Sequence, residues 1–556
     1  MSDGREISKV TRGAATVGIA TALSRITGFL RDVAIANFFG AAGATDAFFV
    51  AFRIPNMFRR LLGEGRGSLT SAFVPIFSES LEREGPDESR RFFATTAGWL
   101  LLALAVVVAL GVAFSPALIS VFSPGFKTEP EKFRLAVLLN RVMFPYLLFI
   151  SAVALLMGVL NSLGHFLAPA IAPVLLNASL IAAAFVSPNL KVPVLALAVA
   201  VVVAGVLQLT LQLPPLASRR FLVAPRLGGL TEQHRRLLKL MVPATLGFVV
   251  YSVNILITPA IGSMLAEGAI SYLYYADRLV QLPLAIIGIS FATALLPSLS
   301  RSAARADMDE FRETLSASIH KIAFLSIPAA AGLFVLAGPI VQVLFERGKF
   351  TPDATAATAD ALAAYAVGLL AFSVAQVLLR AFYAQKDLWT PLASELIAAL
   401  SFLLLSVALV GPLQNPPVAL IGKIFDNFHI FSLGHAGIAL AFSLAAYIQV
   451  LFLALRLGRR MGGAGIRRLA VPILKILAAA ILMGALLDLA LNFFTFFEFA
   501  YKISIWKRGG MLLALICAGA VAYGGAALLL GEEEAARAWS ALSARLGRWT
   551  RNRRGG

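Results

Sequence analysis

Residues 24–79 read SRITGFLRDVAIANFFGAAGATDAFFVAFRIPNMFRRLLGEGRGSLTSAFVPIFSE, and this stretch decides the fold class. It predicts two long apolar helices joined by a short loop at residues 40–44. Charged side chains nevertheless interrupt both helices, namely Arg25, Arg31, Asp32, Asp46, Arg53, Arg59, Arg60 and Glu64. A lone charge at bilayer depth costs about 2.5–3.5 kcal/mol on insertion scales, so a cluster of charges indicates a protein-lined aqueous cavity.

The spacing of these charges predicts which of them share a helix face, because residues seven apart lie nearly in line. Arg25 and Asp32 share one line, and Asp46, Arg53 and Arg60 share another. Six arginines stand against three acids in the stretch, namely Arg25, Arg31, Arg53, Arg59, Arg60 and Arg66 against Asp32, Asp46 and Glu64. The surplus of buried positive charge predicts an anionic partner. The alternative is internal pairing, in which arginines and aspartates join the two helices to each other.

Composition places the chain among polytopic membrane proteins, since 59% of its 556 residues are hydrophobic and 14% are charged, against about 25% charged in soluble domains. Its one cysteine, Cys517, excludes an intramolecular disulfide. None of the five histidines has metal-ligand spacing, so no metal is expected. The net charge of +18 arises mostly from short loops between apolar segments, which favours membrane orientation over nucleic-acid binding.

Runs of about 20 apolar residues predict an all-α protein of about fourteen transmembrane helices. These lie near 14–39, 45–77, 92–114, 134–160, 168–187, 193–216, 238–262, 268–299, 316–338, 355–382, 388–411, 436–456, 470–493 and 509–530. The first helix is expected to be retained, because no small-residue cleavage site follows it. The spans at 45–77 and 268–299 are longer than a bilayer requires, and we expect bends near Pro55 and Pro283.

An internal repeat organises the spans into two halves. Pro75 and Pro297 end similar AFVP and ALLP segments 222 positions apart, and SPALISVFSPG resembles AGPIVQVLFERG at an offset of 223. We therefore expect two homologous six-helix bundles of parallel topology, residues 1–217 and 218–456. Residues 457–556 add two helices and a basic tail. Paired bundles of this kind commonly enclose a substrate site at the membrane midplane.

Loop charge predicts the orientation of the chain. Of the 48 lysines and arginines, 29 lie on the side that holds both termini, 10 on the other side and 9 within spans. Both termini are therefore predicted to be cytoplasmic.

Arg278, in the segment SYLYYADRLVQLP, is a cation in the second half and is predicted to complete the cavity. The alternative is that it extends along its span to a headgroup. The glycines of GEGRG lack the context of a nucleotide-binding loop, and no residue set offers an activated nucleophile. The sequence therefore predicts neither a nucleotide cofactor nor an enzyme.

Several segments together resemble the MurJ (MviN) family of lipid II flippases, within the multidrug/oligosaccharidyl-lipid/polysaccharide exporter superfamily. These segments are SRITGFLRD, GATDAFFVAFRIPNMFRRLLGEG, AFVPIFSE, NSLGHFLAPAIAPVLLN, YYADRLVQLP, LLPSLS and RAFYAQKDLWTP. The resemblance implies a multi-pass protein of the bacterial cytoplasmic membrane. It would move undecaprenyl-diphosphate carrying the peptidoglycan disaccharide-pentapeptide from the inner to the outer leaflet, with the last two spans forming a groove for the lipid tail. It also suggests the cell-wall synthesis machinery as a partner.

The resemblance assigns roles to seven positions. Its basic residues match at Arg25, Arg31, Arg59 and Arg278, where they would bind the diphosphate, and its supporting acids match at Asp32, Asp46 and Glu64. Arginine forks suit such a compact anion because they bind phosphate oxygens bidentately. Ion coupling stays open, but span 238–262 carries no acid for the sodium site of some superfamily relatives.

Other functions remain as alternatives. A multidrug antiporter would need an acidic cavity, whereas this one is basic. A flippase for another polyprenyl-diphosphate oligosaccharide fits the charge but not the opening motifs. A non-transporting scaffold would not need buried arginines.

Overall fold

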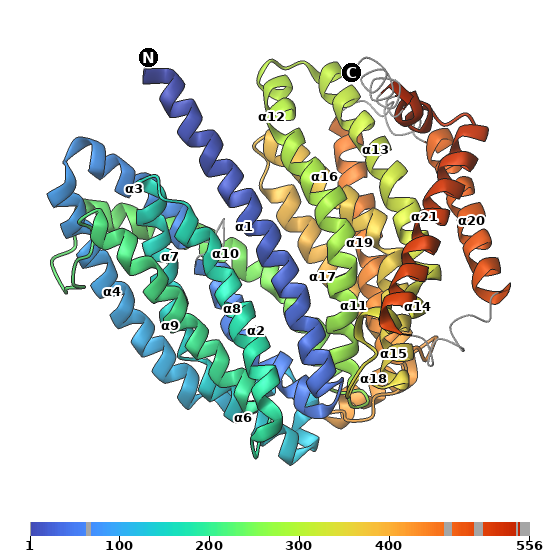
Figure 1. Cartoon of the computed structure of the whole chain (residues 1–556), viewed down its shortest axis with the longest axis horizontal. Coiled ribbons are helices and arrows are strands. Elements are labelled where there is room, and N and C mark those ends of the chain that lie inside the picture. The colour runs from blue at the N-terminus through green and yellow to red at the C-terminus, as the bar shows by residue number, and fades with distance from the viewer. Residues whose placement is uncertain (1, 63–67, 461–469, 494–503, 541–542, 545–556) are drawn as a thin grey trace. The chain divides into compact units, whose positions relative to one another are not determined.

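The computed structural model describes residues 2–62, 68–460, 470–493, 504–540 and 543–544, and these form helices joined by turns and loops, with no strand among them (Figure 1). Side chains are described for all of these except residues 2–16, 58–62, 68, 242–255 and 493. The all-α fold class is thereby confirmed.

The helices of the first half and its connection to the second are α1 (Ser2–Phe39), α2 (Gly43–Leu62), α3 (Ser68–Arg83), α4 (Pro86–Ala113), α5 (Ser115–Phe122), η1 (Pro124–Thr128), α6 (Pro130–Met143), α7 (Tyr146–Ser162), α8 (Leu167–Val186), η2 (Ser187–Asn189), α9 (Leu195–Ser218) and α10 (Glu232–Gly262). The later helices are α11 (Ala269–Leu284), η3 (Ala285–Ile289), α12 (Ser290–Ala304), α13 (Met308–Val335), α14 (Ala337–Phe345), α15 (Pro352–Val367), α16 (Leu369–Ala384), α17 (Trp389–Val410), α18 (Ala419–Phe428), α19 (Gly434–Arg460), α20 (Ala470–Phe493) and α21 (Ile505–Leu529).

Within the described residues, ten helices are long and apolar enough to cross a membrane. The number is eleven if α15 and α16, which meet at a bend of 43°, form one broken span. All eleven overlap spans expected from the sequence, including the two C-terminal ones, so the chain is a multi-pass membrane protein. The expected spans 14–39, 45–77 and 238–262 are helical in the described ranges but are not among the eleven. The total of fourteen therefore stays a prediction.

One of the two overlong spans changes its helix type within the described residues, and the other is described only in part. In the second, the α-helix gives way to a π-helical segment, Ala285–Ile289, directly after Pro283. This is where the sequence predicts a bend, because proline has no N–H to continue the helical hydrogen bonding. In the first, α2 includes Pro55 within one α-helix, and residues 63–67, between α2 and α3, lie outside the described residues.

The internal repeat is also visible in the residues at which the helices start. Helices α4 and α13 start 222 residues apart (308 − 86), as do α5 and α14 (337 − 115) and α8 and α17 (389 − 167). The offset of 222 residues changes at the connection that follows α8 and α17. Residues 187–194 join α8 to α9, whereas residues 411–433 join α17 to α19. The second connection is therefore fifteen residues longer (23 against 8), and it contains α18.

Contacts between residues divide the chain into two compact units. Unit 1 holds residues 1–271 with 347–351 and 414–419, and unit 2 holds the rest. The core of unit 1 includes the stacked rings of Phe73, Phe77 and Phe92, and that of unit 2 centres on Phe311 and Phe382. Contact assigns α10 to unit 1, whereas the repeat register makes α10 the counterpart of α1. The boundary at 217/218 rests on the repeat and stays a prediction.

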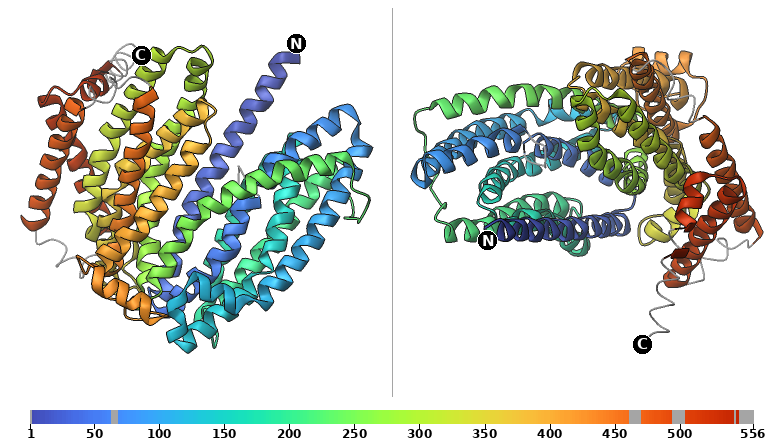
Figure 2. Two further views of the ribbon diagram at one scale, coloured as in Figure 1. Left: turned by 180° about the vertical axis from the view of Figure 1, so that it is seen from behind. Right: turned by 90° about the horizontal axis from the view of Figure 1, so that it is seen from above.

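Within unit 2, helices α20 and α21 lie side by side and pack on α13 (Figures 1 and 2). The Tyr523 hydroxyl donates to the carbonyl of Phe324, and His320 contacts the buried Glu532 carboxylate at 2.7 Å. Helix α21 and the segment after it are therefore held to α13 by polar contacts as well as by packing.

The QKDLWTP motif forms the start of α17. The Asp387 carboxylate accepts hydrogen bonds from the backbone of Thr390 and from Arg460 at the end of α19. Desolvation would raise the pKa of Asp387, but these hydrogen bonds outweigh it and lower that pKa to about 2. The carboxylate is thus ionised at neutral pH and caps the helix, as an N-terminal anion should.

Candidate functional site

Arg31 is the best-defined cation of the predicted site. It lies on α1 and is 7% exposed. Its Nη2 and Nε donate to one oxygen of the neighbouring Asp32 at 2.6 and 3.0 Å, and its Nη1 donates to Asn177 of α8 at 3.0 Å. The amide of Asn177 in turn donates to the carbonyl of Ser24 and the hydroxyl of Thr27 on α1. The plane of the guanidinium is therefore fixed from two helices.

The Arg31–Asp32 pair was not expected from helix geometry, which places Asp32 in line with Arg25. Adjacent positions on a helix point about 100° apart, but the arginine side chain is long enough to turn back to its neighbour. The pair holds the cation buried with its charge balanced, which satisfies the requirement that buried charges be paired. Asp32 therefore pairs with Arg31, and its supporting role at a substrate site stays a prediction.

Asp46 lies in the first turn of α2 and is 1% exposed. Its carboxylate accepts hydrogen bonds from the N–H of Gly268 at 2.8 Å, the N–H of Ser271 at 2.9 Å and the Ser271 hydroxyl at 2.6 Å. The ammonium of Lys132 lies 3.6 Å away. Asp46 therefore caps the first turn of α11 from a distant part of the chain, and its cationic neighbour is a lysine. The predicted role of Asp46 in orienting an arginine stays a prediction.

Arg278 lies on the part of α11 that belongs to unit 2 and is half-buried. Its Nη2 donates to the hydroxyl of Tyr274 at 3.1 Å, and its guanidinium lies 4.9 Å from the centre of that ring. Gln281 accepts from Nη1 at 3.4 Å and donates to Asp277. Arg278 is therefore positioned by residues three and four places away on its own helix.

The other predicted site residues are less defined. Arg25 lies on α1 with its side chain exposed. Arg59 lies on α2, but its side chain is outside the described residues, and Glu64 lies outside them altogether. Of the seven predicted positions, the structure joins Arg31 to Asp32 directly. The assignment of the remaining positions to one site stays a prediction.

Asn177 and Lys132 contribute to these contacts and were not singled out in the sequence. Asn177 offered a signal, because it is a polar residue within the apolar run APAIAPVLLN. Lys132 offered none, since its sequence position gives no sign that it meets Asp46. A third missed polar residue is Glu395 on α17, a mostly buried acid that accepts a hydrogen bond from Gln449 of α19 at 3.1 Å.

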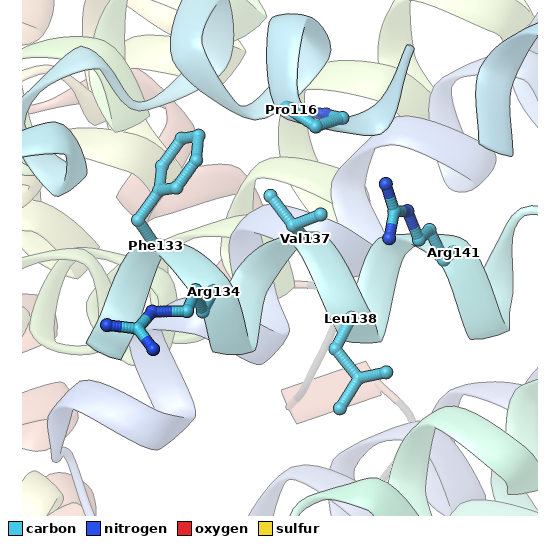
Figure 3. Close-up of a pocket in the computed structure, with 6 residues that line it drawn as sticks. All are labelled: Pro116, Phe133, Arg134, Val137, Leu138 and Arg141. Atoms are coloured by element: carbon cyan, nitrogen blue, oxygen red, sulfur yellow. The ribbon is translucent and has the colours of Figure 1, made fainter. Parts of the chain in front are cut away.

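The described residues contain no group of three or more His, Cys, Asp or Glu side chains that could hold a metal ion. One pocket, of about 240 Å³, lies between α5 and α6 (Figure 3). It is lined by Pro116, Phe133, Arg134, Val137, Leu138 and Arg141. None of the predicted site residues lines it. Its two exposed arginines, Arg134 and Arg141, are therefore control positions for substitutions of the buried Arg31.

Sequence comparisons relate nearly the whole chain to one family. A family model described as lipid II flippase MurJ matches residues 35–506. The lipid II flippase MurJ of Burkholderia cenocepacia is 39% identical over 460 residues, covering 81% of this chain and 84% of the relative. The probable lipid II flippase MurJ of Rhizobium meliloti is 36% identical over 543 residues, covering 95% and 97%.

Solved structures give the same result. A lipid II flippase MurJ in an inward closed conformation matches with a TM-score of 0.71 and 26% identity, over 93% of this chain and 97% of that one. An inward-facing multidrug resistance MATE family transporter of the MOP superfamily matches with a TM-score of 0.61 and 15% identity, over 78% and 94%. At that identity, the second likeness shows the fold alone.

Proposed function

This chain belongs to the MurJ family of lipid II flippases, and from that premise we propose that it carries lipid II from the inner to the outer leaflet of the bacterial cytoplasmic membrane by alternating access. The family is one of transporters, and the chain has the multi-pass helical fold and the two-fold repeat that alternating access uses. Its ligands would be lipid II and the surrounding membrane lipids. The cell-wall synthesis machinery would receive lipid II on the outer side.

The observation that carries the proposal is the buried guanidinium of Arg31, oriented by Asp32 and Asn177. A diphosphate is a compact anion with oxygens that match a planar arginine fork. Exchange of the Asp32 carboxylate for diphosphate oxygens would keep the guanidinium paired while substrate is bound. Arg25, Arg59 and Arg278 supply further positive charge in the proposal, and Glu64 is a further supporting acid. The exposed apolar side chains of α20 and α21 would contact the polyprenyl tail.

Depletion of the protein in cells tests the substrate assignment. We expect lipid II to accumulate on the cytoplasmic side, because its synthesis continues while its translocation stops. The measurement is the accessibility of lipid II, in spheroplasts, to an externally added enzyme that degrades it. Accumulation of a different polyprenyl-diphosphate oligosaccharide, with lipid II still exposed, would instead identify the alternative class of flippase.

Reporter fusions test the orientation predicted from loop charge. Fusions after Glu84, Arg226 and Arg460 should report a cytoplasmic location, because positively charged loops are retained on that side. Fusions after Lys127, Ala266 and Asp353 should report an external location. A reversal among the first six loops would contradict the two-bundle arrangement.

A further inference from the structure

Among the described residues, the connection between α17 and α19 is where the second half has a helix that the first half lacks. Its counterpart in the first half, residues 187–194, has only the short 3-10 turn η2. Residues 411–433 include α18, a ten-residue helix of sequence ALIGKIFDNF. This helix is too short to cross a bilayer, which needs about 20 residues. The fold of the bundle as seen in the first half does not require it.

Helix α18 presents an exposed apolar stripe. Leu420, Ile424 and Phe428 recur every four residues and therefore lie on one face of the helix. Leu420 and Phe428 are 66% and 68% exposed, and Ile424 between them is 38% exposed. An apolar stripe of this length exposed to water is unfavourable in proportion to its area.

The rest of the helix is divided between protein and water. Phe425, one position from the stripe, is 4% exposed and attaches the helix to the protein. Lys423 and Asp426 are exposed, at about 160° and 100° from Phe425 around the helix. At 100° per residue, the apolar stripe lies between the packed face and the polar face. A helix lying flat at a membrane surface beside its own protein needs these three faces.

The segment that follows α18 joins this stripe to the surface of a membrane span. The N–H groups of Ile430 and Phe431 both donate to the carbonyl of Ala408, in the last turns of α17, at 2.8 and 3.1 Å. Ile430 and Phe431 are nevertheless 73% and 55% exposed. Leu404 of α17, a helix long and apolar enough to cross a membrane, is likewise an exposed apolar residue, at 71% exposure. The apolar surface of α17 therefore continues through these two residues toward α18.

We propose that α18 is an interfacial helix, which lies in the plane of the membrane with Leu420, Ile424 and Phe428 inserted among the lipid acyl chains on the side where α17 ends. The partner of the apolar stripe is the lipid bilayer itself, while Lys423 and Asp426 remain in water. The inference is independent of the transported substrate. In this proposal, the connection at residues 411–433 anchors the second bundle at one membrane surface.

Fluorescence quenching in lipid vesicles tests the proposal with the full-length protein. Cys517 is the chain's one cysteine, so a Cys517→Ser background allows a single cysteine to be introduced and labelled with an environment-sensitive dye. The test positions are Ile424→Cys and Phe428→Cys, and the matched control on the same helix is Asp426→Cys. Each is exposed to quencher-bearing phospholipids and to iodide in the aqueous phase.

Labels at 424 and 428 should be quenched by the lipid quencher about threefold more strongly than the label at 426, because an interfacial helix buries its apolar face about 5–10 Å below the surface. Iodide should show the reverse order. Equal iodide quenching at all three positions would place α18 in water and overturn the proposal. Protection of 424 and 428 from both quenchers would mean that a protein surface, such as a second copy of the chain, covers the stripe, and it would also overturn the proposal. Leu420→Cys provides a second apolar position if either variant fails to assemble.

Discussion

Replacing Arg31 by alanine is expected to abolish lipid II transport, whereas replacing it by lysine should leave partial activity. Lysine keeps the charge but loses the planar fork, and a hydrogen bond to a charged group is worth about 1.5–3 kcal/mol. Loss of one such bond corresponds to roughly tenfold or more in affinity. The measurement is binding of lipid II to the purified variants, beside the same lipid lacking its diphosphate. The wild type should discriminate between the two lipids, and the alanine variant should not.

Two control variants distinguish the loss of any positive charge from a change at the Arg31 site itself. Arg141→Ala removes an exposed arginine of α6 that lines the pocket between α5 and α6, and it should bind lipid II as the wild type does. Asp32→Asn removes the orienting carboxylate but keeps the cation, so it should impair transport less than Arg31→Ala. Normal lipid II binding by Arg31→Ala would show that the buried pair is only structural. The opposite ranking of the Asp32 and Arg31 variants in a complementation assay would favour proton coupling by the acid.

Stability must be measured in the same series, because Arg31 does not simply line water. Removing an arginine that lines an aqueous cavity and packs little should leave the protein level unchanged. Arg31 is instead buried against Asp32, and removing one member of a buried pair costs about 3–5 kcal/mol. The double variant Arg31→Ala, Asp32→Asn removes the uncompensated carboxylate. It should regain stability over the single variant but remain inactive.

Local patterns in the sequence predicted the features of the fold that depend on local physics. Apolar runs predicted the spans from α4 to α21 that the structure contains, and the repeat register anticipated the matching starts of α4 and α13. Pro283 marked the change to π-helical bonding because its effect acts within one turn. Helix α18 was not predicted, since a ten-residue amphipathic segment between two spans reads as part of a loop.

The site was harder to predict because its contacts depend on side-chain reach and on distant pairing. Helical spacing gives the direction of Cβ, so it separated Arg31 from Asp32 by about 100° and missed their bond. Asp46 bonds residues 222 and 225 positions away, which no local period can indicate. The sequence did identify Arg31 and Asp46 as charges that require an explanation, and the structure gives each of them a different one.

Asp46→Ala is expected to destabilise the protein by about 3 kcal/mol, because it removes one of the two carboxylates, with that of Glu129, that lie 3.6 Å from the buried Lys132 ammonium. It also removes the acceptor for the N–H groups of Gly268 and Ser271 at the start of α11, and unsatisfied buried donors add to the cost. The measurement is the thermal unfolding midpoint of the purified protein. Asp46→Asn should be intermediate, since its amide oxygen still accepts a hydrogen bond.

The matched control is Asp309→Ala, which removes an acid from the first turn of α13. Its side chain is 92% exposed and pairs with Arg312 at the surface, where such a pair is worth about 0–1 kcal/mol. It should therefore unfold close to the wild-type midpoint. If Asp46→Ala also unfolds at the wild-type midpoint but fails to transport lipid II, the carboxylate acts in transport instead of holding the start of α11. If it unfolds early and its residual folded fraction transports at the normal rate, Asp46 is a structural cap for α11.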